Sequence, residues 1–158
     1  MKVSGIICEY NPFHNGHCYH IKKTRENGAT HIVAVMSGNY VQRGDVAIID
    51  KFERAKAAVK SGADLVIELP VAYSLSSAEV FARGAMYILN AMGCVDEVSF
   101  GSESGDINKI LSAVQASIAC SQSPELKTLL DSGLSYPSAM NMLAEKNFGK
   151  QVGDVFQW

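Results

Sequence analysis

Charge is scarce in this sequence, and neither sign dominates. Only 19% of the 158 residues are charged, and 14 lysines and arginines nearly balance 16 aspartates and glutamates, which leaves a formal net charge of −2. A nucleic-acid-binding surface usually shows as a basic excess. Composition therefore gives no argument for nucleic-acid binding, and any basic surface has to be local or to lie elsewhere.

Cysteine is sparse, and long apolar runs and repeats are missing. The four cysteines, at positions 8, 18, 94 and 120, form no C-x-x-C pair, so we interpret them as reduced thiols of a cytosolic protein. No run approaches the roughly 18 apolar residues of a membrane span, and no signal-peptide pattern precedes the first strand. With 47% hydrophobic residues, we expect a folded, cytoplasmic protein with a sizeable core.

The sequence does contain a fourfold alternation of strand and helix patterns. The buried strand patterns cover residues 3–8, 30–36, 64–69 and 97–100. The helix patterns between them cover residues 16–26, 51–61 and 77–92. Such alternation predicts an α/β fold with a doubly wound parallel sheet, for which we infer the strand order 3-2-1-4.

The pattern changes after residue 105, where we place the end of this core. Residues 106–158 are a predicted helical extension, with helices at 106–120, 124–130 and 136–147. The tail ends on the apolar run Val155-Phe156-Gln157-Trp158, on which a folded chain rarely stops. We therefore expect the sequence to be part of a longer protein.

The stretch that joins the first strand to the first helix has the features of a phosphate site. Asn11 and Pro12 end the strand, and Gly16 and His17 begin the helix. The first N–H groups of a helix lack internal partners and lie at the positive end of its dipole, so they attract anions such as phosphate. His14 and His17 add donors there, and Gly16 lets a ligand approach the backbone.

This His-x-Gly-His pattern after a strand resembles the signature of the nucleotidylyl transferase superfamily. Three segments narrow the resemblance: Glu-Tyr-Asn-Pro-Phe-His-Asn-Gly-His at 9–17, Met-Ser-Gly-Asn-Tyr-Val-Gln-Arg-Gly-Asp at 36–45, and Ile-Glu-Leu-Pro at 67–70. In this order they resemble the bacterial tRNA(Met) cytidine acetate ligases. The resemblance implies a Rossmann-like fold and a two-step reaction. Acetate attacks ATP to give acetyl-adenylate and pyrophosphate, and the acetyl group passes to N4 of the wobble cytidine of elongator tRNA(Met).

The resemblance also implies which residues meet the ligands. His14 and His17 are the expected catalytic residues, which stabilise charge on the α-phosphate and the departing pyrophosphate. The expected ATP contacts are the strand-to-helix segment and one later glycine: Ile7, Cys8, Glu9, Tyr10, Asn11, Pro12, Phe13, His14, Asn15, Gly16, His17, Cys18, Tyr19, His20 and Gly101. The expected contacts to acetate or RNA follow the second strand: Ser37, Gly38, Asn39, Gln42 and Arg43.

Alternatives stay open for several of these side chains. His20 touches phosphate or packs at the helix base, and Arg43 binds a carboxylate, binds an RNA phosphate, or is a solvated surface charge. Glu68 and Glu103 orient donors, bind a metal or cap the chain locally. No cysteine or carboxylate stands at ligand spacing from the histidines, so we expect no resident metal and assign any Mg²⁺ to the triphosphate.

Other side chains are expected to be structural. We expect His31 to have a structural role, and we place Tyr19, Phe52 and Tyr87 in the core rather than in base-stacking platforms. Lys51 lies beside the polar loop after the second strand, where it has a functional role or, like Arg54, only occupies an exposed helix face. The expected inward faces of the second and third helices comprise Phe52, Ala55 and Val59, and Val80, Gly84, Tyr87, Ile88 and Ala91, respectively.

Some of the family's pattern is missing up to Trp158. The second phosphate-binding motif of the superfamily, Ile-Ser-x-x-x-x-Arg, is absent, as are the later Asn and Arg of the family's ATP site. We therefore expect these 158 residues to bind nucleotide weakly without turnover. Two other functions stay open: a nucleotidylyl transferase that makes a cofactor, and a non-catalytic nucleotide-binding module. The sequence predicts no oligomeric state.

Overall fold

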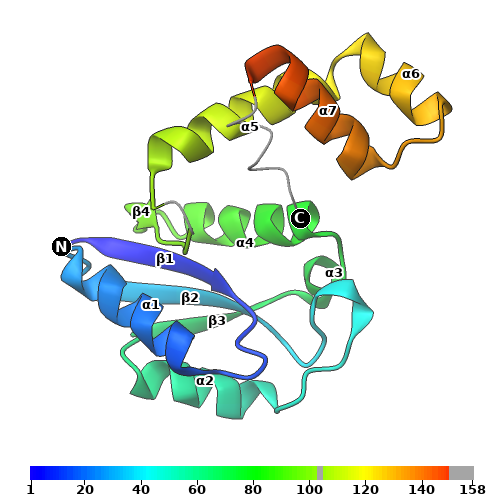
Figure 1. Ribbon diagram of the computed structural model, residues 1–158. Coiled ribbons are helices and arrows are strands. Elements are labelled where there is room, and N and C mark those ends of the chain that lie inside the picture. Colours follow the sequence, from blue (N-terminus) through cyan, green and yellow to red (C-terminus); the bar gives the residue numbers. More distant parts are fainter. Residues whose placement is uncertain (103–104, 150–158) are drawn as a thin grey trace. The chain divides into compact units, whose positions relative to one another are not determined.

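A computed structural model describes residues 1–102 and 105–149 of the chain, which divides into two compact units, Met1–Gly101 and Ser102–Trp158 (Figure 1). The first unit is built on a parallel sheet of four strands. The strands are β1 (Val3–Cys8), β2 (His31–Ser37), β3 (Leu65–Leu69) and β4 (Glu97–Val98). Their order, β3-β2-β1-β4, confirms the predicted one.

Helices cover both faces of this sheet (Figure 1). The helices α1 (Asn15–Glu26) and α2 (Lys51–Lys60) lie on one face, and α3 (Val71–Ser74) and α4 (Ala78–Ala91) on the other. Side chains alternate along a strand, so β2 contributes to both cores. Ile32, Ala34 and Met36 pack in the first core, and Val33 and Val35 in the second. The α/β fold predicted from the sequence is thus confirmed.

The inward faces of two helices differ in part from those predicted: Gly84 is buried as predicted, and Ala55 and Ile88 pack against the cores, but other positions do not. On α2, Phe52 is 71% exposed and Val59 is exposed, whereas Ala58 is buried. On α4, Tyr87 is 73% exposed, and the buried positions are Phe81, Gly84, Ala85 and Leu89. Both helices carry apolar residues on more than one side, so the periodicity alone did not decide which side meets the sheet.

The placement of the aromatic residues in the core was also wrong. Tyr19, like Phe52 and Tyr87, is an exposed side chain. Tyr19 lies on α1, where Ile21 and Thr24 are the buried residues. Ile21 follows Tyr19 by two positions, and residues at that spacing point in different directions on a helix. Because Ile21 faces the sheet, Tyr19 is left at the surface.

The second unit contains three helices within its described residues. They are α5 (Ile107–Ser121), α6 (Pro124–Asp131) and α7 (Tyr136–Phe148). Asp106, Ser123 and Ser135 cap their N-termini with side-chain oxygens, as their residue types favour. A small core holds the three together: Cys120, Leu126, Ala139, Met140, Leu143 and Ala144. The apolar end of the chain and Glu103 lie outside the described residues.

Candidate functional site

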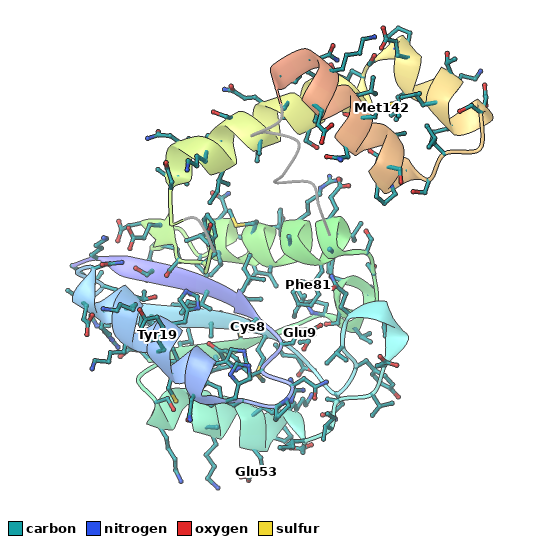
Figure 2. The ribbon with its side chains drawn as sticks, in the orientation of Figure 1. Cys8, Glu9, Tyr19, Glu53, Phe81 and Met142 are labelled. Carbon is teal, nitrogen blue, oxygen red and sulfur yellow. The ribbon has the colours of Figure 1, made fainter. Side chains whose placement is uncertain are left out.

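A cavity of about 570 Å³ opens at the carboxyl end of β1. Figure 2 shows Cys8 and Glu9 at this end of the strand and Phe81 on α4. Most of the lining comes from the segment that joins β1 to α1, with contributions from α1, from the loop after β2 and from α4. The lining residues are Ile6, Ile7, Cys8, Glu9, Tyr10, Asn11, Pro12, His14, His17, His20, Gln42, Ala78 and Phe81.

The cavity brings together much of the predicted ATP set, but not all of it. Nine of the predicted ATP contacts line it: Ile7, Cys8, Glu9, Tyr10, Asn11, Pro12, His14, His17 and His20. The lining does not include Phe13, Asn15, Gly16, Cys18, Tyr19 or Gly101. Of the predicted acetate or RNA contacts, Gln42 lines the cavity, whereas Ser37, Gly38 and Asn39 do not.

Sequence reasoning missed the contribution of α4. Ala78 is the first residue of this helix, after the N-cap Ser77, and Phe81 follows one turn later. A helix that follows a strand in a parallel sheet begins near the carboxyl ends of the strands. The crossover after β3 therefore indicates that the first turn of α4 approaches this edge, and that signal was present in the sequence.

His14 and His17 are tied to each other through the backbone of the first turn of α1. His14 is the N-cap, and its Nδ1 accepts a hydrogen bond from the backbone N–H of Gly16 at 3.1 Å. The backbone N–H of His14 in turn donates to Nδ1 of His17 at 3.2 Å. Because both Nδ1 atoms accept, each neutral ring carries its proton on Nε2. Both histidines can thus donate from Nε2 to an anion.

The two rings are held face to face. Their centroids lie 3.7 Å apart with 26° between the planes. A Cβ at Gly16 would lie 2.9 Å from Cε1 of His14, closer than a side chain tolerates, so the glycine leaves room for this ring position. Tyr10 packs edge-on against His17, with centroids 4.8 Å apart, and fixes it from the other side.

Burial favours the neutral forms of His17 and His20. Desolvation lowers the pKa of His17, and the neighbouring His14 and His20 lower it further. Desolvation also lowers the pKa of His20. A neutral imidazole is a hydrogen-bond donor that gains a charge only when an anion stabilises it. The site can therefore respond to a phosphate that enters it.

Burial disfavours the thiolate form of Cys8, the thiol in the cavity. Burial raises the pKa of Cys8 to about 12, and a nucleophilic or metal-binding cysteine needs its thiolate. Tyr10, only 1% exposed, has its pKa raised by the same cause. The backbone φ of Tyr10 is 51°, a conformation that residues other than glycine rarely adopt. The end of β1 is thus a buried and strained turn.

His20 both lines the cavity and contacts another part of the chain, so phosphate contact stays a prediction for it. Its ring lines the cavity, and its Nε2 lies 3.0 Å from Oγ of Ser99. That hydroxyl is also 2.6 Å from Oγ1 of Thr24, which donates to the carbonyl of His20. The ring is therefore anchored to the chain after β4 and faces the cavity at the same time.

The segment after β2 is more ordered than its loop composition indicated. Residues Gln42–Gly44 form a 3₁₀ turn, η1, and Tyr40 pairs with Val46 in an antiparallel bridge. Its backbone N–H groups at Gln42 and Ile48 donate to the side chains of Glu9 and Asn11, respectively, both at 2.7 Å. The β1–α1 segment thus holds this loop, and Glu9 and Asn11 are structural acceptors.

Lys51 and Arg54 do more than occupy an exposed helix face, which was one of the alternatives from the sequence. Nζ of Lys51 forms an ion pair with Glu68 at 2.6 Å, and the backbone N–H of Lys51 donates to Asn39 at 3.1 Å. Arg54 is buried, with 1% of its surface exposed. The charge of Arg54 suggested a solvent-exposed position, but its guanidinium donates to the backbone carbonyls of Glu9, Gly38 and Ile49.

In the described ranges, 1–102 and 105–149, no group of three His, Cys, Asp or Glu side chains could hold a metal ion. None of the helices described there is long and apolar enough to span a membrane. The side-chain position of Arg43 lies outside this description.

Comparison with known proteins decides the family. The model of the HIGH nucleotidyl transferase family matches residues 1–155. The chain belongs to the HIGH nucleotidyl transferase family. The match covers the histidine pair, and the resemblance noted in the sequence is confirmed.

Curated relatives in this family carry a more specific name. The chain is 50% identical over 149 residues to the tRNA(Met) cytidine acetate ligase of Acetivibrio thermocellus, covering 92% of this chain and 36% of that protein. It is 53% identical over 157 residues to the ligase of the same name from Clostridium novyi, covering 96% and 39%. The chain therefore spans less than two fifths of the length of these relatives.

A solved structure agrees with the fold. The chain is similar to Thermotoga maritima TmcAL bound with alpha-thio ATP, with a TM-score of 0.82 and 41% identity, over 99% of this chain and 39% of that one. The unliganded form of the same protein gives a TM-score of 0.83 at 42% identity. Thermotoga maritima TmcAL thus has the fold that the sequence led us to expect for this chain. Its structure contains an ATP analogue.

Proposed function

We propose that this chain carries the ATP site of a tRNA(Met) cytidine acetate ligase. ATP activates acetate to acetyl-adenylate with release of pyrophosphate, and the acetyl group is transferred to N4 of the wobble cytidine of elongator tRNA(Met). The observation that carries the proposal is the histidine pair at the N-terminus of α1, with both Nδ1 atoms occupied and both rings lining one cavity. The ATP-analogue complex of a relative with 41% identity supports it.

The first step brings two anions together, so its catalysis consists of positioning and charge neutralisation. We assign this task to the Nε2 donors of His14 and His17 and to the positive end of the α1 dipole. Nucleophilic attack comes from the acetate, so no protein nucleophile is needed. Burial raises the pKa of Cys8, so its thiolate is disfavoured, and we assign to this residue only the lining of the site.

Gln42 is our choice for a contact to the second substrate. It is the residue of the predicted acetate or RNA set that lines the cavity, and its backbone is held by Glu9. We keep Ser37, Gly38, Asn39 and Arg43 as candidates for acetate or tRNA contacts at the adjoining edge. We propose acetate and tRNA(Met) as partners, which the names of the relatives support, and a cytoplasmic site of action.

Mg²⁺ would reach this site with the triphosphate. The described residues that line the cavity provide one carboxylate, on Glu9, which already accepts a hydrogen bond from Gln42. This set does not suit a resident divalent ion, which prefers several oxygen ligands. The ion would supply charge neutralisation to the phosphates, whose own oxygens hold it.

The test is ATP binding by this chain, measured by titration calorimetry, for the wild type and for His14→Ala and His17→Ala. Loss of a hydrogen bond to a charged group costs about 1.5–3 kcal/mol, so each variant should bind ATP roughly 10- to 100-fold more weakly. His31→Ala, at the exposed start of β2, is the matched control. Unchanged affinity in both site variants would contradict the phosphate-site assignment.

A second measurement identifies the reaction. Pyrophosphate release from ATP is followed with the Thermotoga maritima relative and with this chain, with and without acetate and bulk tRNA. We expect acetate to drive release in the full-length relative, and the present chain to bind ATP without release. Release that depends on another acceptor would favour a cofactor-making transferase, and ATP binding without release by the relative would favour a binding module.

A further inference from the structure

Arg54 is buried, in contrast to the exposed helix face considered from the sequence. It lies on α2, between the exposed Glu53 and the half-buried Ala55, and only 1% of its own surface is exposed. The ion pairs found among residues 1–102 and 105–149 do not include it. A buried charge without a paired carboxylate is costly unless hydrogen bonds replace its hydration.

Backbone carbonyls supply those hydrogen bonds. Nε donates to the carbonyl of Ile49 at 2.9 Å. One terminal nitrogen donates to the carbonyl of Glu9, directly after β1, and the other to the carbonyl of Gly38, directly after β2. A guanidinium presents its donors in a rigid planar fork. The side chain therefore fixes the ends of two neighbouring strands and the start of α2 relative to one another.

These three carbonyls belong to the two segments that form the site. Glu9 lines the cavity and holds the backbone of Gln42, which lines it too. Asn11, also in the lining, holds the backbone of Ile48. These two hydrogen bonds join the β1–α1 segment to residues 38–50, as the guanidinium of Arg54 also does. A small change in the separation of the two segments would move Glu9, Asn11 and Gln42 together.

We propose that Arg54 is a positioning residue of the nucleotide site, whose guanidinium sets the separation between the β1–α1 segment and the loop at residues 38–50. The part of this inference that concerns ATP rests on the proposed function. The part that concerns the two segments rests on the hydrogen bonds alone.

The chain offers a matched control in Arg25. This arginine, on α1, also bridges separate segments through backbone carbonyls, donating to Thr30, to Gly62 at 2.8 Å and to the carboxylate of Asp64. It lies at the opposite edge of the sheet, where β2 and β3 begin. Arg25→Lys and Arg54→Lys both keep the charge and lose the fork, so they separate general destabilisation from an effect on the site.

The experiment compares the two variants with the wild type in hydrogen exchange of the Gln42 and Ile48 amides and in ATP titration. In Arg54→Lys we expect both amides to exchange on the order of tenfold faster. The reason is that the loop at residues 38–50 moves away from the β1–α1 segment, whose Glu9 and Asn11 side chains accept the hydrogen bonds of these amides. ATP should bind on the order of 10- to 100-fold more weakly, as for a site misplaced by a fraction of an ångström. Arg25→Lys should change neither quantity, even where its thermal midpoint falls equally.

Unchanged exchange at Gln42 and Ile48 in folded Arg54→Lys overturns the proposal, and so does equal acceleration in Arg25→Lys. If wild-type protein does not bind ATP, the proposed function fails, and the exchange rates still decide the positioning role. If Arg54→Lys does not fold, the wild type is measured instead by NMR. The Nε–H of Arg54 should exchange far more slowly than that of Arg83, whose side chain is 78% exposed, and equal rates overturn the proposal.

Discussion

The imidazole rings of His14 and His17 stack at a centroid distance of 3.7 Å, and each Nδ1 accepts a backbone hydrogen bond from the turn that joins them. The pair is thus part of the helix cap as well as of the cavity. The two hydrogen bonds to the Nδ1 atoms cap the helix, and they leave the Nε2–H of each ring to donate to a ligand. This arrangement links the stability of the turn to the protonation state of the site.

The first prediction concerns pH. Burial, with His14 and His20 nearby, places the pKa of His17 in the folded protein below its ordinary value of 6.5. Between these two pKa values the unfolded chain binds more protons, so stability rises with pH in that window. The free energy of unfolding should therefore fall as pH drops below 6.5 and continue to fall to the pKa of the folded state.

Denaturant unfolding between pH 4.5 and 7.5 measures this. His17→Asn, whose side-chain oxygen can still accept from the backbone of His14, should flatten the slope below pH 6.5. The remaining slope includes His20, whose pKa burial also lowers. If His17→Asn leaves this slope unchanged, the pKa of His17 does not differ between the folded and the unfolded state, and the prediction is wrong.

The second prediction concerns the thiols. Burial raises the pKa of Cys8 to about 12, whereas Cys94 is exposed. Because the thiolate is the reactive form, iodoacetamide at pH 8 should label Cys94 within minutes and Cys8 only after denaturation. Mass spectrometry of the peptides measures the extent of labelling at each thiol, with Cys94→Ser as the control. Rapid labelling of Cys8 in the folded chain would contradict the buried position of this thiol.

The third prediction tests which face of α4 meets the sheet. Leu89 is 1% exposed and packs in the core with Val33 and Val35. Leu89→Ala should lower the free energy of unfolding by about 2–5 kcal/mol. Tyr87→Ala, on the exposed side of the same helix, should change it by less than ~0.5 kcal/mol. Urea denaturation of both variants decides between this face and the one inferred from periodicity.

The fourth prediction concerns Gly38, which is buried at the end of β2. A Cβ there would collide with the carboxylate of Glu68, which pairs with Lys51. This carboxylate is the far end of a flexible, half-exposed side chain and can move aside. Gly38→Ala should therefore displace it from Lys51 and destabilise the protein by about 0.2–1 kcal/mol, as loss of an exposed ion pair does. Because Glu68→Ala removes the same ion pair, the double variant Gly38→Ala/Glu68→Ala should be as stable as Glu68→Ala alone in thermal unfolding. A double variant clearly less stable than Glu68→Ala would show that the added Cβ meets another obstacle.

Much of the fold follows from local chemistry. The strand patterns begin and end within a few residues of β1, β2 and β3, and the caps Asp50, Ser77 and Asp106 stand where their residue types favour them. The strand-to-helix turn with His14 and His17 was evident for the same reason, because all its parts are neighbours in the chain. Capping and strand formation depend on adjacent residues, which the sequence displays directly.

The sequence by itself therefore determined the alternating strands and helices, the strand order expected of the fold class, and the histidine pair at a helix N-terminus. The tertiary structure decided which faces of α2 and α4 are buried, the approach of Ala78 and Phe81 to the cavity, and the burial of Arg54. These depend on groups far apart in the chain. The carbonyls of Glu9 and Gly38 become partners of Arg54 only when β1 and β2 pair side by side.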